Sequence, residues 1–235
     1  VGTFSRVGYG EWELNYTPHH GKNYRLVVEV PGHPTITATT TMPTPVDIYR
    51  GDPRNQNITK PFTQSSHSAP FWICALTSSL KESQHVLKKP KVEDDAQARL
   101  ISTIATTHKD ADRFTQDEIV DRSNTFNDGS TPYKNYIRVA PNPAITRDNP
   151  YHFTIAYGEA WASFIVMRSA STEYDRYLKS ILEKLKFYED ADDPARWFDE
   201  TVIFSNIENG LGIFAAYWQQ SFYYNNIYPS TPTAP

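Results

Sequence analysis

The fold class is decided by residues 151–168, which read YHFTIAYGEAWASFIVMR. Apolar or aromatic side chains alternate with other residues along 151–157, and a second apolar run follows at 161–168. Alternation with a period of two is typical of a β-strand with one buried face. Gly158-Glu159 lies between the runs, and glycine at the first central position is what a type II′ turn requires. The stretch therefore predicts a β-hairpin and a mainly β protein.

More strands are predicted on both sides of this hairpin. Residues 24–30 alternate in the same way, 31–34 form a turn, and 36–41 suit a returning strand. Met42-Pro43-Thr44-Pro45 then ends the pairing, because two prolines remove two donors from a strand ladder. We place a domain boundary there, with a β-strand region at 1–45 and a larger β-rich domain at 46–235. Residues 50–68 are polar and turn-rich, and further strands are predicted at 69–76, 101–107, 136–140, 201–207 and 211–217.

One helix is predicted at about 172–189. Its apolar residues recur with the i, i+3, i+4, i+7 spacing of a helix face, at Tyr174, Tyr177, Leu178, Ile181, Leu182, Leu185 and Tyr188. Thr172 is the expected N-cap, and Glu173 and Asp175 place negative charge in the first turn. We expect the apolar stripe to pack on a sheet. The predicted fold is an antiparallel β-sandwich or open barrel with one long packed helix.

Composition excludes several classes of function. The chain has 235 residues, a net charge of −4 and 39% hydrophobic residues. A net negative charge argues against a nucleic-acid partner, and no apolar run approaches the ~20 residues that span a bilayer. The single cysteine, Cys74, excludes a cysteine-rich metal site, and its apolar surroundings indicate a small buried residue rather than a nucleophile.

The most distinctive string in the chain is SNIENGLGIF, residues 205–214. It resembles the closing motif of the domain-of-unknown-function 4249 family, predicted surface lipoproteins of Bacteroidota. The preceding parts follow a similar order, with a Tyr-x-Leu-x-Val strand at 24–28, a Pro-x-Pro junction at 43–45, a hairpin, and a Thr-Glu-Tyr helix opening at 172–174. The resemblance covers about residues 20–220 and is most specific at 202–217.

The resemblance implies a lipid-anchored protein on the outer membrane of a Gram-negative bacterium, often encoded beside a TonB-dependent transporter. It also implies an immunoglobulin-like sandwich followed by a larger β-rich domain, so residues 1–45 are expected to be the end of that sandwich. The anchor is inferred from the resemblance, because Cys74 lies too far inside the chain to be the lipidated residue.

Taken from its residues, the motif is structural. Asn206 is expected to hydrogen-bond to nearby backbone, Asn209-Gly210 to form a turn, and Gly210 and Gly212 to supply backbone freedom. Its apolar members are expected to fill a core, namely Ile207, Leu211, Ile213 and Phe214.

No catalytic residue and no metal site is predicted. The seven histidines lack the His-x-x-x-His and His-Glu-x-x-His spacings, and the chain has no Gly-x-Ser-x-Gly elbow. The acidic run 189–193, EDADD, offers the oxygen ligands that calcium takes but not the spacing of a calcium loop. We therefore expect no cofactor, with calcium at 189–193 as the alternative.

Aromatic residues make up 14% of the chain, and flat aromatic side chains stack on sugars and suit protein interfaces. The stripe at 174–188 and the hairpin assign many of them to packing. The candidate ligand-binding residues are Trp12, Trp197, Tyr223 and Tyr224, with packing in the β-rich core as the alternative.

The leading hypothesis is a non-enzymatic cell-surface domain that binds a glycan, a peptide or a TonB-dependent transporter. The alternative is an adhesion or structural module of the envelope without a small-molecule site, and a surface hydrolase ranks third.

Overall fold

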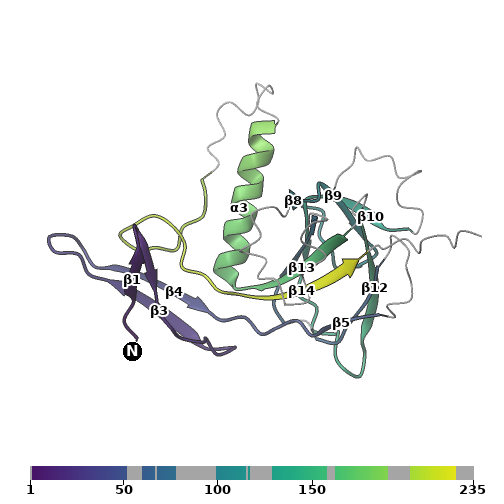
Figure 1. Ribbon diagram of the computed structural model, residues 1–235, viewed down its shortest axis with the longest axis horizontal. Coiled ribbons are helices and arrows are strands. Elements are labelled where there is room, and N and C mark those ends of the chain that lie inside the picture. The colour runs from purple at the N-terminus through teal and green to yellow at the C-terminus, as the bar shows by residue number, and fades with distance from the viewer. Residues whose placement is uncertain are drawn as a thin grey trace, which may run out of the picture.

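The computed structural model describes residues 2–51, 60–66, 68–77, 99–114, 116, 129–157, 162–189 and 202–225. Its described elements are antiparallel strands and one helix, α3 (Thr172–Glu189). Figure 1 shows a strand-rich body with α3 beside it and two hairpins at the far end, near the N-terminus. The predicted mainly β class, with antiparallel sheets and one helix, is confirmed.

Two antiparallel sheets form the body of the molecule. The first has the order β10 (Thr131–Lys134), β9 (Thr103–Thr106), β12 (Tyr151–Tyr157), β6 (Lys60–Gln64) and β5 (Ile48–Arg50). The second has the order β11 (Tyr136–Val139), β7 (Phe71–Thr77), β13 (Ala162–Ala170) and β14 (Tyr217–Asn225), with β8 (Arg99–Leu100) paired to β7. Side chains of both sheets share one buried core, including Phe62, Ile104 and Ile155 from the first and Phe71, Ile73 and Ile165 from the second. The arrangement is a sandwich, and the described strands do not close into a barrel.

The two sheets are joined along both sides. On one side β10 leads into β11 through Asn135, whose φ of 62° turns the chain and whose backbone N–H donates to the Ser102 carbonyl at 2.8 Å. On the other side, side chains cross between β5 and β14. Gln220 Nε2 donates to the Ile48 carbonyl at 3.2 Å, and Arg50 Nη1 donates to the Tyr223 carbonyl at 3.3 Å. These bonds cover strand edges that would otherwise offer unpaired backbone groups.

The predicted hairpin at 151–168 is wrong in its pairing. Both strands form, but β12 pairs with β6 and β9, whereas β13 pairs with β7 and β14. Each strand is therefore central in its own sheet, and the chain crosses from one layer to the other between them. Alternation identifies a strand but does not identify its partner. The predicted turn at Gly158-Glu159 lies outside the described residues.

The strands predicted at 201–207 and 211–217 are also wrong. Residues 202–216 contain a single β-bridge, between Thr37 and Glu208, and the strand begins at Tyr217. Side chains of this segment hydrogen-bond to its backbone N–H groups, which would otherwise be free to pair with a strand. Conversely, β6 lies in the region that reads as polar and turn-rich. The sequence does not indicate this strand, because Pro61 lacks a backbone N–H donor. The Pro61 carbonyl still accepts the Gly51 N–H at 2.9 Å.

The first part of the chain forms two small hairpins. β1 (Ser5–Gly8) pairs with β2 (Glu11–Glu13), and β3 (Asn23–Val28) pairs with β4 (Ile36–Thr41). The strands predicted at 24–30 and 36–41 are thus confirmed. Residues 42–47 form neither helix nor strand and lead into β5. The domain boundary at residue 45 stays a prediction.

Helix α3 has the predicted bounds but a different cap. Ser171, not Thr172, is the N-cap, because its Oγ accepts the Tyr174 N–H at 3.2 Å. The helix begins directly after β13, and its first turns lie over the outer face of the second sheet. Leu185, expected in the packed stripe, is 53% exposed. No helix among the described residues is long and apolar enough to cross a membrane.

Candidate functional site

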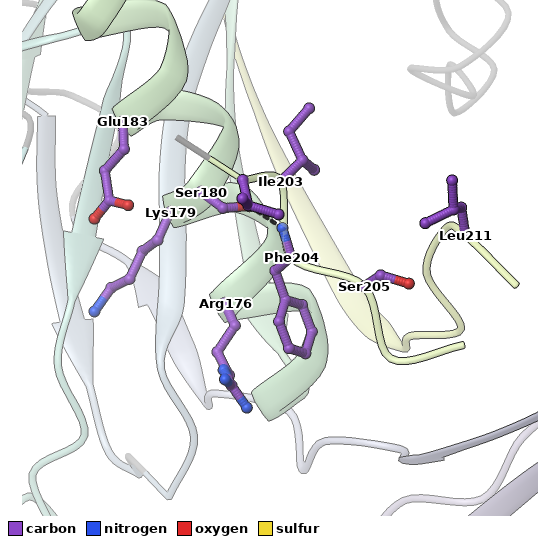
Figure 2. A pocket seen from close by; sticks show the side chains of 9 residues that line it. Arg176, Lys179, Ser180, Glu183, Ile203, Phe204, Ser205 and Leu211 are labelled. Carbon is purple, nitrogen blue, oxygen red and sulfur yellow. Dashed lines mark hydrogen bonds between the residues drawn. The ribbon is translucent and has the colours of Figure 1, made fainter. Parts of the chain in front are cut away.

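A groove lies between α3 and the segment that precedes β14. Its volume is about 560 Å³. The helix contributes Arg176, Lys179, Ser180 and Glu183. The segment 202–211 contributes Val202, Ile203, Phe204, Ser205 and Leu211 (Figure 2). The aliphatic side chains all come from the segment and the charged ones all come from the helix.

Ser180 and Arg176 of α3 hold the segment 202–211 against the helix through Phe204. Ser180 Oγ accepts the Phe204 N–H at 2.9 Å and donates to the Tyr177 carbonyl at 2.8 Å. The Arg176 guanidinium lies 4.3 Å from the centre of the Phe204 ring, so that this aromatic face is covered by a cation (Figure 2). Helix and segment therefore form one surface.

The loop at 205–214 is held in shape by its own side chains. Ser205 Oγ accepts the Gly212 N–H at 3.2 Å, and Asn206 Oδ1 accepts the Phe214 N–H at 2.9 Å. Asn209 and Gly212 adopt positive φ angles of 60° and 127°. The predicted role of Asn206 and the predicted freedom of Gly212 agree with this geometry.

Gly210 plays a different part from the one expected. It has no positive φ angle; instead, a Cβ at this position would lie 2.9 Å from Ile207 Cγ2. Its small size permits a close approach within the loop.

Leu211 was expected in the core, but it is 95% exposed at the rim of the groove. Leu211 lies between the residues that the Ser205–Gly212 and Asn206–Phe214 hydrogen bonds join. The loop therefore presents an aliphatic side chain to solvent on a hydrogen-bonded backbone. Most isolated exposed leucines need no explanation, but this one lines the same groove as Val202 and Ile203, which are also exposed. Together with the groove they form an apolar surface.

The same loop binds the β3–β4 hairpin. Asn206 Nδ2 donates to the Thr39 carbonyl at 3.0 Å and to the Phe214 carbonyl at 2.8 Å. Asn209 Nδ2 donates to the Thr35 carbonyl at 2.9 Å. Thr37 and Glu208 exchange two backbone hydrogen bonds, of 3.3 and 2.8 Å. The motif thus fastens the N-terminal hairpin to the segment beside α3.

Of the four predicted aromatic residues, Trp12 and Tyr223 are described with their side chains, and they lie on strands of different sheets. Trp12 is 62% exposed on β2, in the hairpin at the end of the molecule. Tyr223 lies on β14 with its ring 5.0 Å from that of Phe164, and its hydroxyl is buried without a hydrogen-bond partner among the described residues. Burial raises the pKa of this hydroxyl. Tyr224 is on β14, but its side chain is not described, and Trp197 lies outside the described residues. Ligand binding by any of them stays a prediction.

Sequence reasoning missed the charged side of the groove. Arg176, Lys179, Ser180 and Glu183 follow the i, i+3, i+4, i+7 spacing, which is the signal that places them on one helix face. Because they are polar, they read as a solvent-facing surface, and nothing in their pattern indicates that an exposed segment lies beside them.

A buried charge cluster joins α3 to the second sheet. Arg138 donates from Nε and Nη2 to both carboxylate oxygens of Asp175, at 2.7 and 2.8 Å, and from Nη1 to Asp112 at 2.6 Å. Trp72 Nε1 donates to the same Asp175 at 2.9 Å. Burial disfavours the charge on Arg138, but the hydrogen bonds to Asp175 and Asp112 outweigh it and raise its pKa. Each charged group of the cluster has a partner of opposite charge, which suits a structural role.

Within the described residues, no group of three histidine, cysteine, aspartate or glutamate side chains is placed to hold a metal ion. The acidic run considered for calcium is not covered by this finding, because 190–193 and the side chain of Glu189 are outside the described part of the chain.

Cys74 lies on β7, and burial raises the pKa of its thiol to about 11. At pH 8 only about 0.1% of the folded protein then carries a thiolate, so we expect Cys74 to react with iodoacetamide at least a hundredfold more slowly than in guanidinium chloride. The rate should rise with pH toward 11. Mass spectrometry of timed samples measures both rates, and equal rates in the two solvents would contradict the raised pKa of this half-buried thiol.

The fold and the groove define a β-sandwich protein with a packed helix and an exposed apolar surface beside it. The chain belongs to the DUF4249 family, described as a domain of unknown function, whose sequence model matches residues 3–222. Comparison with curated proteins and with solved structures gave no match. The family resemblance at 205–214 is thereby confirmed.

Proposed function

We propose that this chain is a non-enzymatic binding domain of the cell surface that takes a protein partner at the groove between α3 and residues 202–211. The observation that carries the proposal is Leu211, an almost fully exposed leucine on a hydrogen-bonded loop. Presenting an apolar side chain on a rigid backbone reduces the entropy lost on binding. The proposed partner is a peptide segment, as on a membrane transporter.

The chemistry of the groove favours a peptide over a glycan. Sugars stack on open aromatic faces, but the Phe204 ring is covered on one face by Arg176. The exposed aliphatic residues suit apolar side chains of a partner, and Arg176, Lys179 and Glu183 can pair with its polar groups. Trp12 remains the residue on which a sugar would be tested.

Photo-crosslinking at the groove tests the proposal. With benzoylphenylalanine at position 211, we expect a crosslinked band of defined mass in native membranes. An excess of unlabelled wild-type protein should abolish this band. An excess of the unlabelled Leu211→Asp variant should not reduce it. Because Leu211 is exposed, its replacement should change the free energy of unfolding by less than about 0.5 kcal/mol.

Asp148 is the matched control site, since it is exposed in a loop distant in sequence from the groove. The same band from position 148, or equal competition by both proteins, would contradict a partner site at the groove. Absence of any band from position 211 would favour the adhesion or structural module.

A further inference from the structure

The β3–β4 hairpin has one strand edge in use and one open. On the outer side of β4, Thr37 exchanges two backbone hydrogen bonds with Glu208. Among the described strands, β3 pairs with β4 alone. Within the described part of the chain, the open edge of the hairpin is therefore that of β3. The hairpin lies at the end of the molecule away from the sandwich (Figure 1).

The backbone of β3 directs hydrogen-bonding groups toward this open edge at known positions. Thr37 points its N–H and C=O away from β3, because both are bonded to Glu208. Residues that face each other in an antiparallel pair either exchange both bonds or none. Val27 faces Thr37, so its N–H and C=O point outward, and those of Arg25 follow by alternation; Glu29 comes directly after Val28, the last residue of β3.

The open edge is also apolar. Val27, Val28 and Val30 are 49%, 37% and 43% exposed. Long exposed edges with apolar side chains are templates for pairing with another strand, and natural proteins usually protect them. Here the protecting features are one arginine and one glutamate, and their positions matter.

Arg25 and Glu29 are placed symmetrically about Val27, two residues before it and two after it. If two copies of β3 pair antiparallel about a two-fold axis at Val27, each Arg25 faces Glu29 of the other copy. Val27 faces its own counterpart, and Leu26 faces Val28. Opposite charges across a strand pair stabilise it, whereas an axis at Arg25 or at Glu29 would oppose like charges. The charge pattern therefore favours the axis at Val27, the one two-fold axis that places Arg25 opposite Glu29.

We propose that β3 is a homodimer interface in which two copies of this chain join their β3 edges antiparallel about Val27. The product is a continuous four-stranded sheet with the order β4–β3–β3–β4. The proposed dimer does not depend on the groove and goes beyond the proposed function. A single strand pair buries little area, so we expect a weak dimer that forms at tens of micromolar or above.

Charge reversal tests the register. Sedimentation velocity of the full chain, from about 1 to 300 µM, should show a dimer for wild type. Arg25→Glu and Glu29→Arg each oppose like charges twice in the dimer, so each should raise the dissociation constant about tenfold. The double variant Arg25→Glu with Glu29→Arg restores both opposite pairs and should return within about twofold of wild type. Glu13→Arg, exposed on β2, is the control for the charge change of Glu29→Arg and should have no effect.

Three results would overturn the proposal. The first is a monomer at all concentrations. The second is a dimer in which the double variant is no better than the single variants, which would place the interface elsewhere. The third comes from hydrogen exchange: if the outward N–H of Val27 is already protected where the chain is monomeric, another part of the chain covers the edge. Far-UV circular dichroism of each variant separates these results from misfolding.

Discussion

An Asp175→Ala variant is expected to lose about 3–5 kcal/mol of the free energy of unfolding, the largest loss that we predict for an ionic group. Asp175 accepts three hydrogen bonds, two from Arg138 and one from Trp72. Its removal leaves the Arg138 guanidinium, 11% exposed, with Asp112 as its one ion-pair partner among the described residues. An uncompensated buried charge costs several kcal/mol. Urea unfolding followed by tryptophan fluorescence measures the loss.

Two further variants identify the cause. Glu183→Ala, on an exposed position of the same helix, should change stability by no more than about 0.5 kcal/mol. Combining Asp175→Leu with Arg138→Met removes both charges, and it should recover more than half of the loss, because an apolar pair of similar volume often replaces a buried ion pair at little cost. A double variant as unstable as Asp175→Ala would mean that the loss comes from packing and not from the unpaired charge.

Asn206→Ala is expected to destabilise the protein by about 2–3 kcal/mol, which is large for a partly buried polar residue. Its side chain makes three hydrogen bonds to backbone, two of them within the loop and one to Thr39 of β4, and each contributes about 1 kcal/mol. We expect the contact between the loop and the β3–β4 hairpin to open before the rest of the protein unfolds. Hydrogen exchange at the Thr37 amide, which is bonded to Glu208, should become faster before the sandwich core does.

Asn209→Gly provides a graded comparison for this clamp. Glycine accepts the positive φ of 60° without strain, so the change removes only the hydrogen bond to Thr35, at a cost of about 1 kcal/mol. If Asn206→Ala leaves exchange at Thr37 unchanged, the loop and the hairpin are held together by other contacts.

Local patterns in the sequence predicted the elements that depend on local physics. The helix at 172–189 follows from its apolar spacing and acidic first turn. The strands near 24–30 and 36–41 follow from alternation and flanking prolines, and the strand near 69–76 follows from an apolar run of strand length. The pairing of β12 and β13 could not be predicted in this way. Both strands are buried between two neighbours, so a short turn signal between them did not determine which sheet each one joins.

The site was less accessible to prediction than the fold. The string at 205–214 reads as a core-filling strand pair because Ile207, Leu211, Ile213 and Phe214 are apolar. Its shape is instead set by Ser205 and Asn206, whose side chains bind backbone up to eight residues away and on β4. Such bonds depend on which segments meet in space, and a single sequence does not give that. Asn206 itself was predicted to bind backbone, which it does.

The clamp at Asn206 and Asn209 has a consequence for the order in which the chain assembles. Their partners on and beside β4 lie 167 and 174 residues earlier in the sequence. At synthesis rates of about 5–20 residues per second, the segment that holds the hairpin is made roughly 8–35 s after it. Contacts over such separations form slowly, because a long loop must close first. The first strands to emerge are therefore among the last to reach their final place.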